Sequence, residues 1–120
     1  MPGPGASFDD RIFQRELKMT IRKKYLKTRP ICKVTFKIPA ETGNLAKTAS
    51  LVGEFNNWSF IANPMKRLKN GAFSTTIELE KGKGYQFRYL LDGHKWDNEV
   101  EADKFVPSPY GGSENSVIIV

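Results

Sequence analysis

Two runs of the chain alternate between apolar and polar residues, and this alternation decides the class of fold. The runs span residues 32–38 and 85–91. Side chains of a β-strand point alternately to opposite faces, so a period of two puts all the apolar members on one buried face. A helix needs a spacing of three to four. The two runs therefore predict half-buried strands, whose inward-facing residues are Cys32, Val34, Phe36, Ile38, Tyr85, Phe87, Tyr89 and Leu91.

Short turn signals separate the strands. Asn70-Gly71 and Asp92-Gly93 are typical of two-residue hairpins, because both residue types tolerate the positive φ angles that such turns require. Further strands are expected near residues 48–55, 65–69, 73–79 and 117–120. About seven short strands with closely spaced turns predict an all-β, antiparallel sandwich of two sheets, with the aromatic run 85–91 at its centre.

Residues 1–30 have a different character from the rest of the chain. Residues 1–7 contain two prolines and two glycines, which favours disorder. Phe13, Leu17, Ile21 and Tyr25 then recur every four residues, as on one face of a helix. We therefore expect a disordered or helical arm over residues 1–30, followed by a domain over residues 31–120. Met19 is an alternative first residue, which would make residues 1–18 an upstream extension.

The net charge of +6 comes mainly from this arm, which holds eight of the 19 basic residues and three of the 13 acidic ones. Basic arms can bind phosphate backbones. Such a run is more often a solvated tail, and the domain that follows is close to neutral. We therefore do not expect nucleic acid to be the main partner.

The sequence offers little that could support catalysis. Cys32 is the only cysteine and lies on the inward face of a strand, which is typical of a small core residue. A single cysteine also excludes an internal disulfide framework and a multi-cysteine metal site. His94, the only histidine, lies in a turn with no obvious nucleophile nearby. We expect no enzymatic activity, no cofactor and no metal.

Four carboxylates alternate along residues 97–103, so they would share one face of an extended segment. Paired carboxylates hydrolyse glycosides, and clustered ones bind calcium. A sandwich of this size provides a surface more readily than a deep cleft. We therefore favour a solvated acidic edge, which discourages pairing with other sheets. The residues are Asp97, Glu99, Glu101 and Asp103.

Nothing in the sequence predicts secretion or insertion into a membrane. The first twenty residues contain no apolar run behind a basic start, as a secretory signal would require. No apolar stretch reaches the length that spans a bilayer. We expect a cytoplasmic protein that does not contact membranes.

The candidate binding residues are two tryptophans and the polar groups expected near them. Trp58 follows Asn56-Asn57, whose amides favour a turn, and Arg88 points outward from strand 85–91. An indole offers a flat apolar surface, while amides and guanidinium groups offer hydrogen bonds, and a sugar ring needs both. Two alternatives remain open at this point. Trp58, Arg88, Trp96 and Asn115 form an exposed binding surface, or one indole packs in the core and Arg88 pairs with an acidic neighbour.

Three separated segments resemble the family 48 carbohydrate-binding modules. This family includes the glycogen-binding domain of the AMP-activated protein kinase beta subunit and the early-set N-terminal domains of isoamylases and glycogen branching enzymes. The resemblance covers about residues 30–120, keeps the segments in order, and is greatest to small stand-alone bacterial members. The segments are Val52-Gly53-Glu54-Phe55-Asn56-Asn57-Trp58, residues 85–93 with Trp96, and Asn115-Ser116-Val117-Ile118-Ile119-Val120.

The resemblance implies an immunoglobulin-like early-set domain that binds α-1,4-linked glucan, such as glycogen, starch or maltooligosaccharides, without catalysis. By motif position, Trp58 and Trp96 would stack on glucose units, and Arg88 and Asn115 would bond to hydroxyl groups. Ser113 stands where the kinase domain has a threonine that contacts the sugar.

This chain departs from the kinase domain at two places. Arg88 stands where that domain usually has lysine, and its leucine that pushes through the glucan falls here near Tyr110 or Gly111. Some early-set domains also have only an architectural role beside a catalytic barrel. A second hypothesis is therefore a module that docks on a partner enzyme, such as a glycogen-metabolising one, without binding sugar itself.

Overall fold

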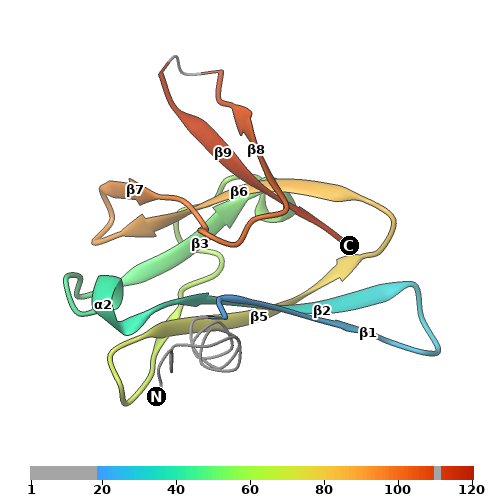
Figure 1. The fold of residues 1–120 in the computed structure, drawn as a ribbon, viewed down its shortest axis with the longest axis horizontal. Coiled ribbons are helices and arrows are strands. Elements are labelled where there is room, and N and C mark those ends of the chain that lie inside the picture. The colour runs from blue at the N-terminus through green and yellow to red at the C-terminus, as the bar shows by residue number, and fades with distance from the viewer. Residues whose placement is uncertain (1–18, 110–111) are drawn as a thin grey trace, which may run out of the picture.

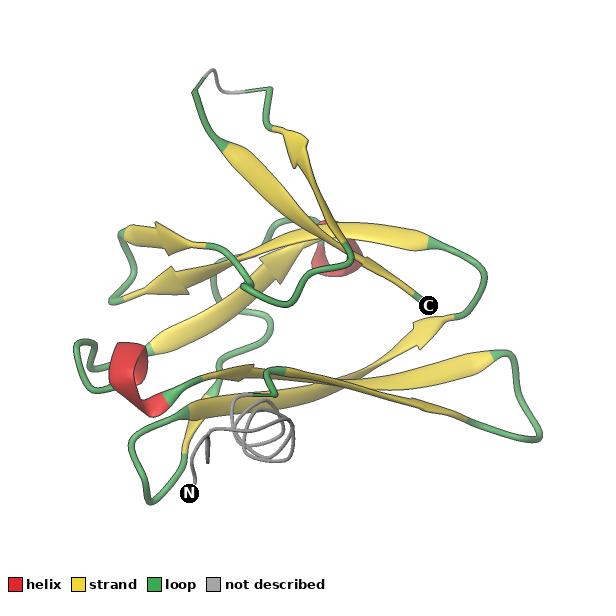
Figure 2. Ribbon diagram, viewed as in Figure 1, coloured by secondary structure: helices red, strands yellow, loops and turns green. Residues whose placement is uncertain are grey.

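The computed structural model describes residues 19–109 and 112–120, and these form two antiparallel sheets that face each other (Figures 1 and 2). The first sheet has the order β1-β2-β5-β4. The second has the order β3-β6-β9-β8, with β7 also paired to β6. The predicted all-β sandwich is confirmed, with nine strands in the described residues where about seven were expected. 

The elements follow one another with short connections. The strands of the first sheet are β1 (Ile21–Tyr25), β2 (Ile31–Ile38), β4 (Lys66–Arg67) and β5 (Phe73–Glu80). Those of the second are β3 (Ala49–Gly53), β6 (Gly84–Leu91), β7 (Lys95–Asp97), β8 (Lys104–Pro107) and β9 (Glu114–Ile119). A short helix, α2 (Ala40–Gly43), and a 3-10 turn, Glu54–Asn56, lie on either side of β3. No helix in the described part of the chain is long and apolar enough to cross a membrane.

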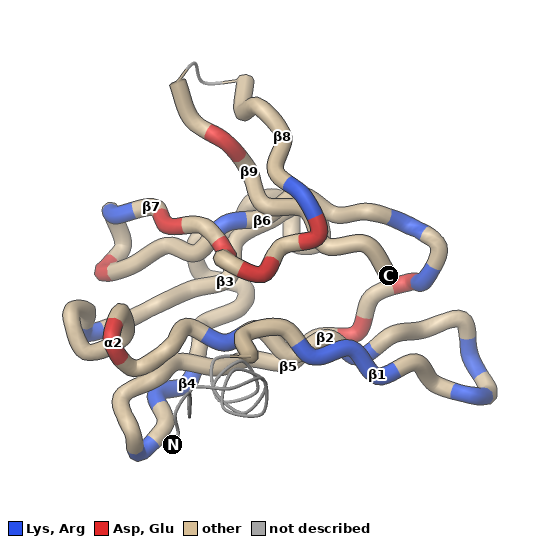
Figure 3. The backbone as a smooth tube through the Cα atoms, viewed as in Figure 1, with Lys and Arg blue, Asp and Glu red and all other residues tan. Residues whose placement is uncertain are grey.

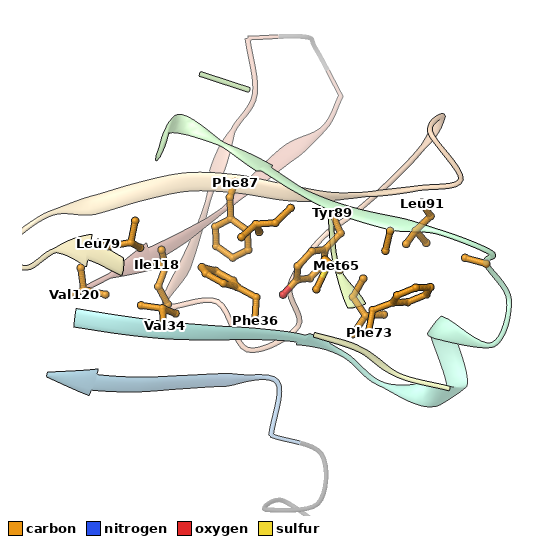
Figure 4. Close-up of a cluster of buried hydrophobic side chains, with 14 of the residues drawn as sticks. Val34, Phe36, Met65, Phe73, Leu79, Phe87, Tyr89, Leu91, Ile118 and Val120 are labelled. Carbon is orange, nitrogen blue, oxygen red and sulfur yellow. The ribbon is translucent and has the colours of Figure 1, made fainter. Parts of the chain in front are cut away.

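The two alternating runs supply the middle of the core. Val34 and Phe36 of β2 point toward Phe87 and Tyr89 of β6, as Figure 4 shows. The rings of Phe36 and Phe87 meet edge to face with centroids 5.0 Å apart. All the predicted inward-facing residues of the two runs are buried except Tyr85, which is partly buried at the margin of the core. The period of two therefore determined which face of each strand turned inward.

Strand β6 is the centre of the second sheet, as predicted, and its register fixes the outer face. It lies between β3 and β9, with Phe87 opposite Ser116 and Arg88 opposite Val52. Phe87 points into the core, so its neighbour Arg88 points to the other side of the sheet.

The expected helix is wrong for residues 21–25, which form strand β1 paired with β2. Ile21 lies opposite Phe36, and Tyr25 lies opposite Cys32. A spacing of four residues fits one face of a helix and equally one face of a strand, so the pattern did not distinguish them. The backbone hydrogen bonds offered by the edge of β2 decided the outcome. This part of the predicted arm belongs to the sandwich, whereas residues 1–18 lie outside the described residues.

The expectation of a solvated acidic edge is wrong for Glu99, which is buried. The Tyr89 hydroxyl donates to Glu99 Oε1 over 2.6 Å, and the Thr20 hydroxyl and the Glu101 backbone N–H donate to Oε2. Burial raises the pKa of Glu99, while these hydrogen bonds lower it by a smaller amount. Glu99 therefore links the start of β1 to the core strand β6.

Two other acidic residues of this segment, Glu101 and Asp103, also bond to protein groups. Figure 3 shows them along the connection from β7 to β8, opposite the basic residues of β1. Asp103 accepts a hydrogen bond from Lys23 Nζ over 3.0 Å. The alternation fails because residues 98–103 form a loop, and strand pairing begins only at Lys104.

Candidate functional site

The loop from Glu54 to Pro64 is fastened by the side-chain amide of Asn56. Its Oδ1 accepts hydrogen bonds from the backbone N–H groups of Gly53 and Ser59, over 3.1 and 3.2 Å. Its Nδ2 donates to the Leu51 carbonyl over 2.9 Å and to Asn63 Oδ1 over 2.7 Å. This amide thus holds both ends of the loop together, as expected of a turn-forming asparagine, and its oxygen and nitrogen are bonded to protein groups.

Trp58 and the residue before it, Asn57, both have an unusual backbone conformation. Asn57 and Trp58 have φ angles of 56° and 57°, in the left-handed region. This conformation is uncommon for a bulky residue and persists only where the surroundings impose it. The Trp58 N–H donates to the Gly53 carbonyl over 2.8 Å, which holds the turn. The indole remains 36% exposed and is not sealed in the core.

Trp96 lies in β7, directly opposite the buried Leu90 of β6 on the outer face of the second sheet. Its side chain is 39% exposed. The ring of Phe60 meets the indole nearly at right angles, with centroids 5.4 Å apart and an interplanar angle of 77°. Phe60 is two residues beyond Trp58, so the loop that carries one tryptophan contacts the other.

Arg88 lies beside Trp96 and is held by two residues of the same outer face. Its Nε donates to Asn115 Oδ1 over 2.7 Å, and Asn115 Nδ2 donates in turn to Gln86 Oε1 over 3.0 Å. The guanidinium carbon is 6.0 Å from the centroid of the Trp96 ring, within the range of a cation–π contact. Arg88 forms no ion pair with any described residue, so the alternative of an acidic partner is not observed there.

One nitrogen of this guanidinium, Nη2, has no hydrogen-bond partner within the described part of the chain. Nη2 of Arg88 is buried and makes no hydrogen bond with the described residues. A buried donor without an acceptor is unfavourable by about 1–3 kcal/mol.

A shallow cavity of about 300 Å³ lies beside Arg88. It is lined by Arg88, Trp96, Asp97, Asn98, Gly112, Ser113 and Glu114. The lining combines a cation, two carboxylates and an aromatic ring. Hydroxyl groups both donate and accept hydrogen bonds, so these groups suit a neutral polyhydroxylated ligand. The two carboxylates would repel an anion.

The five predicted site residues occupy different positions around this cavity. Arg88, Trp96 and Ser113 line it, and the Ser113 carbonyl accepts a hydrogen bond from the Ser108 N–H over 3.0 Å. Asn115 is only 5% exposed and lies behind Arg88, with its amide bonded to protein groups. Trp58 is on the neighbouring loop and is not among the lining residues.

Sequence reasoning missed several residues near the site. Gln86 lies two residues before Arg88 on the same strand, so the alternation of side chains places both on the outward face. The sequence could therefore have identified Gln86 as a neighbour of Arg88. Phe60 was visible as a large apolar residue within a polar loop. Asp97 and Glu114 had no such signal, because only the tertiary structure places them beside Arg88.

These features define an antiparallel β-sandwich domain that presents aromatic rings and a guanidinium group beside a polar surface cavity. Residues 30–111 match the family model described as carbohydrate-binding module 48 (isoamylase N-terminal domain). The chain therefore belongs to this family, as its three motifs predicted, and is a carbohydrate-binding module with the family's immunoglobulin-like fold.

One similar protein is "Protein PTST homolog 2, chloroplastic" from Arabidopsis thaliana. The two sequences are 35% identical over 78 residues, which is 64% of this chain and 13% of the plant protein. This chain thus spans only a small part of that relative.

Proposed function

We propose that this protein binds α-1,4-glucan, such as glycogen, starch fragments or maltooligosaccharides, on the outer face of its second sheet. The observation that carries the proposal is the exposed Trp96 beside Arg88, since both residues line the polar cavity. A glucose unit has an apolar C–H face for the indole and hydroxyl groups for the guanidinium. The family match supports a carbohydrate as the ligand.

The residues have separate roles in this proposal. Trp58 and Trp96 stack on glucose units, Arg88 and Ser113 contact hydroxyl groups, and Asn115 orients Arg88 from behind. Covering one indole face contributes about 1–2 kcal/mol, and each hydroxyl hydrogen bond contributes about 1 kcal/mol. After the losses on association, the expected dissociation constant is about 10 µM to 1 mM.

The proposed role is recognition of the glucan without its cleavage. Of the acidic residues that the sequence placed in one row, Glu99 is buried with its carboxylate bonded to protein groups. Asp103 is paired with Lys23. Glu99 and Asp103 are therefore engaged in holding the fold, whereas the carboxylates beside the cavity are those of Asp97 and Glu114.

Titration of the protein with maltoheptaose, followed by indole fluorescence, tests the proposal. We expect a saturable change in the wild type that weakens at least fivefold in Trp58→Ala and in Trp96→Ala, since each loses about 1–2 kcal/mol of stacking. Tyr25→Ala removes a half-exposed ring from the other sheet and is the matched control, with unchanged affinity.

A glycogen pull-down with the same variants gives an independent measurement. We expect the wild type and Tyr25→Ala in the bound fraction, and both tryptophan variants depleted from it. No response of the wild type to millimolar maltoheptaose, together with no retention on glycogen, would overturn the proposal. That result would favour the alternative, a module that docks on a partner enzyme without binding sugar.

A further inference from the structure

A third aromatic ring, Phe60, lies next to the proposed sugar-binding residues. Its side chain is 54% exposed, although a phenyl ring is strongly apolar. Its ring contact in the described structure is with Trp96, at a centroid distance of 5.4 Å. Phe60 is thus exposed beside Trp96, which is itself 39% exposed.

The loop holds Phe60 in this position without burying it. The Ser59 hydroxyl oxygen accepts hydrogen bonds from the N–H groups of Ile61 and Ala62, over 3.3 and 3.1 Å. The bond from Asn56 Nδ2 to Asn63 Oδ1 closes the loop on both sides of this turn. A ring that is already fixed loses little conformational freedom when a ligand binds, which favours affinity.

Phe60 also connects the loop that carries Trp58 to the second tryptophan. Trp58 and Phe60 are both exposed in one loop, and the Phe60 ring contacts Trp96. Single exposed apolar residues are common on proteins, but contiguous ones mark binding surfaces. The interplanar angle of 77° makes the two rings a corner and not one flat surface. Two rings at such an angle are able to contact two successive sugar units of a bent oligosaccharide.

We propose that Phe60 is a third sugar-contacting ring, which extends the glucan site along the loop and makes the protein prefer longer chains. This inference rests on the proposed function. A short oligosaccharide is able to occupy Trp96 and Arg88 alone. A longer chain places a further unit on Phe60 as well, so only the longer chain gains this contact.

Calorimetric titration of the full chain with maltotriose and with maltoheptaose tests the inference. In Phe60→Ala we expect the affinity for maltoheptaose to fall about fivefold, as the loss of one ring face predicts, and that for maltotriose by less than about twofold. Phe60→Tyr keeps the ring and should bind both sugars like the wild type. Ile61→Ala is the matched control, because Ile61 is the next residue and is 85% exposed. It should change neither affinity.

Three results would overturn the inference. These are an unchanged affinity in Phe60→Ala, an equal loss for both sugars, and an equal effect of Phe60→Ala and Ile61→Ala. Equal thermal unfolding midpoints of the variants establish that the fold is retained. Failure of the proposed function is a distinct result, because the wild type itself would then bind neither sugar.

Discussion

Arg88 donates a hydrogen bond from Nε to Oδ1 of Asn115 over 2.7 Å, between the adjacent strands β6 and β9. The bond forms because Phe87 and Ser116 lie opposite each other with inward side chains, so Arg88, after Phe87, and Asn115, before Ser116, both face outward. It fixes the plane of the guanidinium group beside Trp96. The buried amide of Asn115 thus determines where the donors of Arg88 point.

Replacing Asn115 with alanine is expected to weaken both the fold and the site. The change leaves Arg88 Nε and Gln86 Oε1 without their present partner, and we expect a loss of about 1–3 kcal/mol of unfolding free energy. Glucan affinity should fall as well, because Arg88 loses its orientation. Urea unfolding and maltoheptaose titration measure the two effects. Thr76→Ala, which breaks the exposed Thr35–Thr76 hydrogen bond on the other sheet, is the control and should leave affinity unchanged.

Arg88→Lys tests whether the shape of the cation matters in addition to its charge. Lysine keeps the positive charge but lacks the planar group with a separate Nε donor, so the bond to Asn115 is lost. We expect maltoheptaose affinity to fall about fivefold to tenfold, equivalent to one charged hydrogen bond. Isothermal titration measures this change. Wild-type affinity in Arg88→Lys would show that charge alone is sufficient.

Asn56→Ala should release the loop that carries Trp58 and Phe60. Four hydrogen bonds of the Asn56 amide are lost, and we expect unfolding free energy to fall by about 1–3 kcal/mol. Near-ultraviolet circular dichroism should weaken as the rings lose their fixed surroundings. Asn57→Gly is the matched control, because glycine readily adopts the left-handed φ of 56° observed there. A stable Asn56→Ala variant with an unchanged spectrum would contradict the assigned role.

Glu99→Gln should change how stability depends on pH. Burial raises the pKa of Glu99 above its usual value of 4.5, so the folded state holds this proton more tightly than the unfolded chain. The stability that protonated Glu99 contributes is full below pH 4.5 and is lost as the pH rises through the folded-state pKa. Glutamine carries no charge at any pH.

The difference in melting temperature between Glu99→Gln and the wild type should therefore increase between about pH 4 and pH 7. Other titrating groups are the same in both proteins and cancel in this difference. Differential scanning calorimetry across this range measures it. A difference that stays constant with pH would show that Glu99 has an unshifted pKa in the folded protein.

Much of the fold was predictable because it depends on local patterns. The alternation along residues 32–38 and 85–91 selected the buried faces, and Asp92-Gly93 placed the hairpin that returns to Trp96. The four-residue spacing of Ile21 and Tyr25 failed because it fits both a helix and a strand. A free edge of β2 resolved that ambiguity, and no sequence pattern reveals such an edge.

The site was predictable only in part. Parity placed Arg88 on the outward face of its strand. The sequence left open whether Trp58 is exposed or packs in the core, and the structure shows it 36% exposed. The burial of Asn115 could not be read from a pattern, since it depends on packing across β6 and β9. The burial of Glu99 likewise depends on Tyr89 and Thr20, which are distant in the sequence.

The sequence by itself determined the β-sandwich, the inward and outward faces of its central strands, and the family. These follow from side-chain periodicity, turn-forming residues and contiguous motifs, all of which are local properties of a chain. Only the tertiary structure decided which residues meet on the outer face, where Phe60 contacts Trp96 and Asn115 holds Arg88. Such contacts join residues from separate loops and strands, so their geometry depends on the packing of the whole domain.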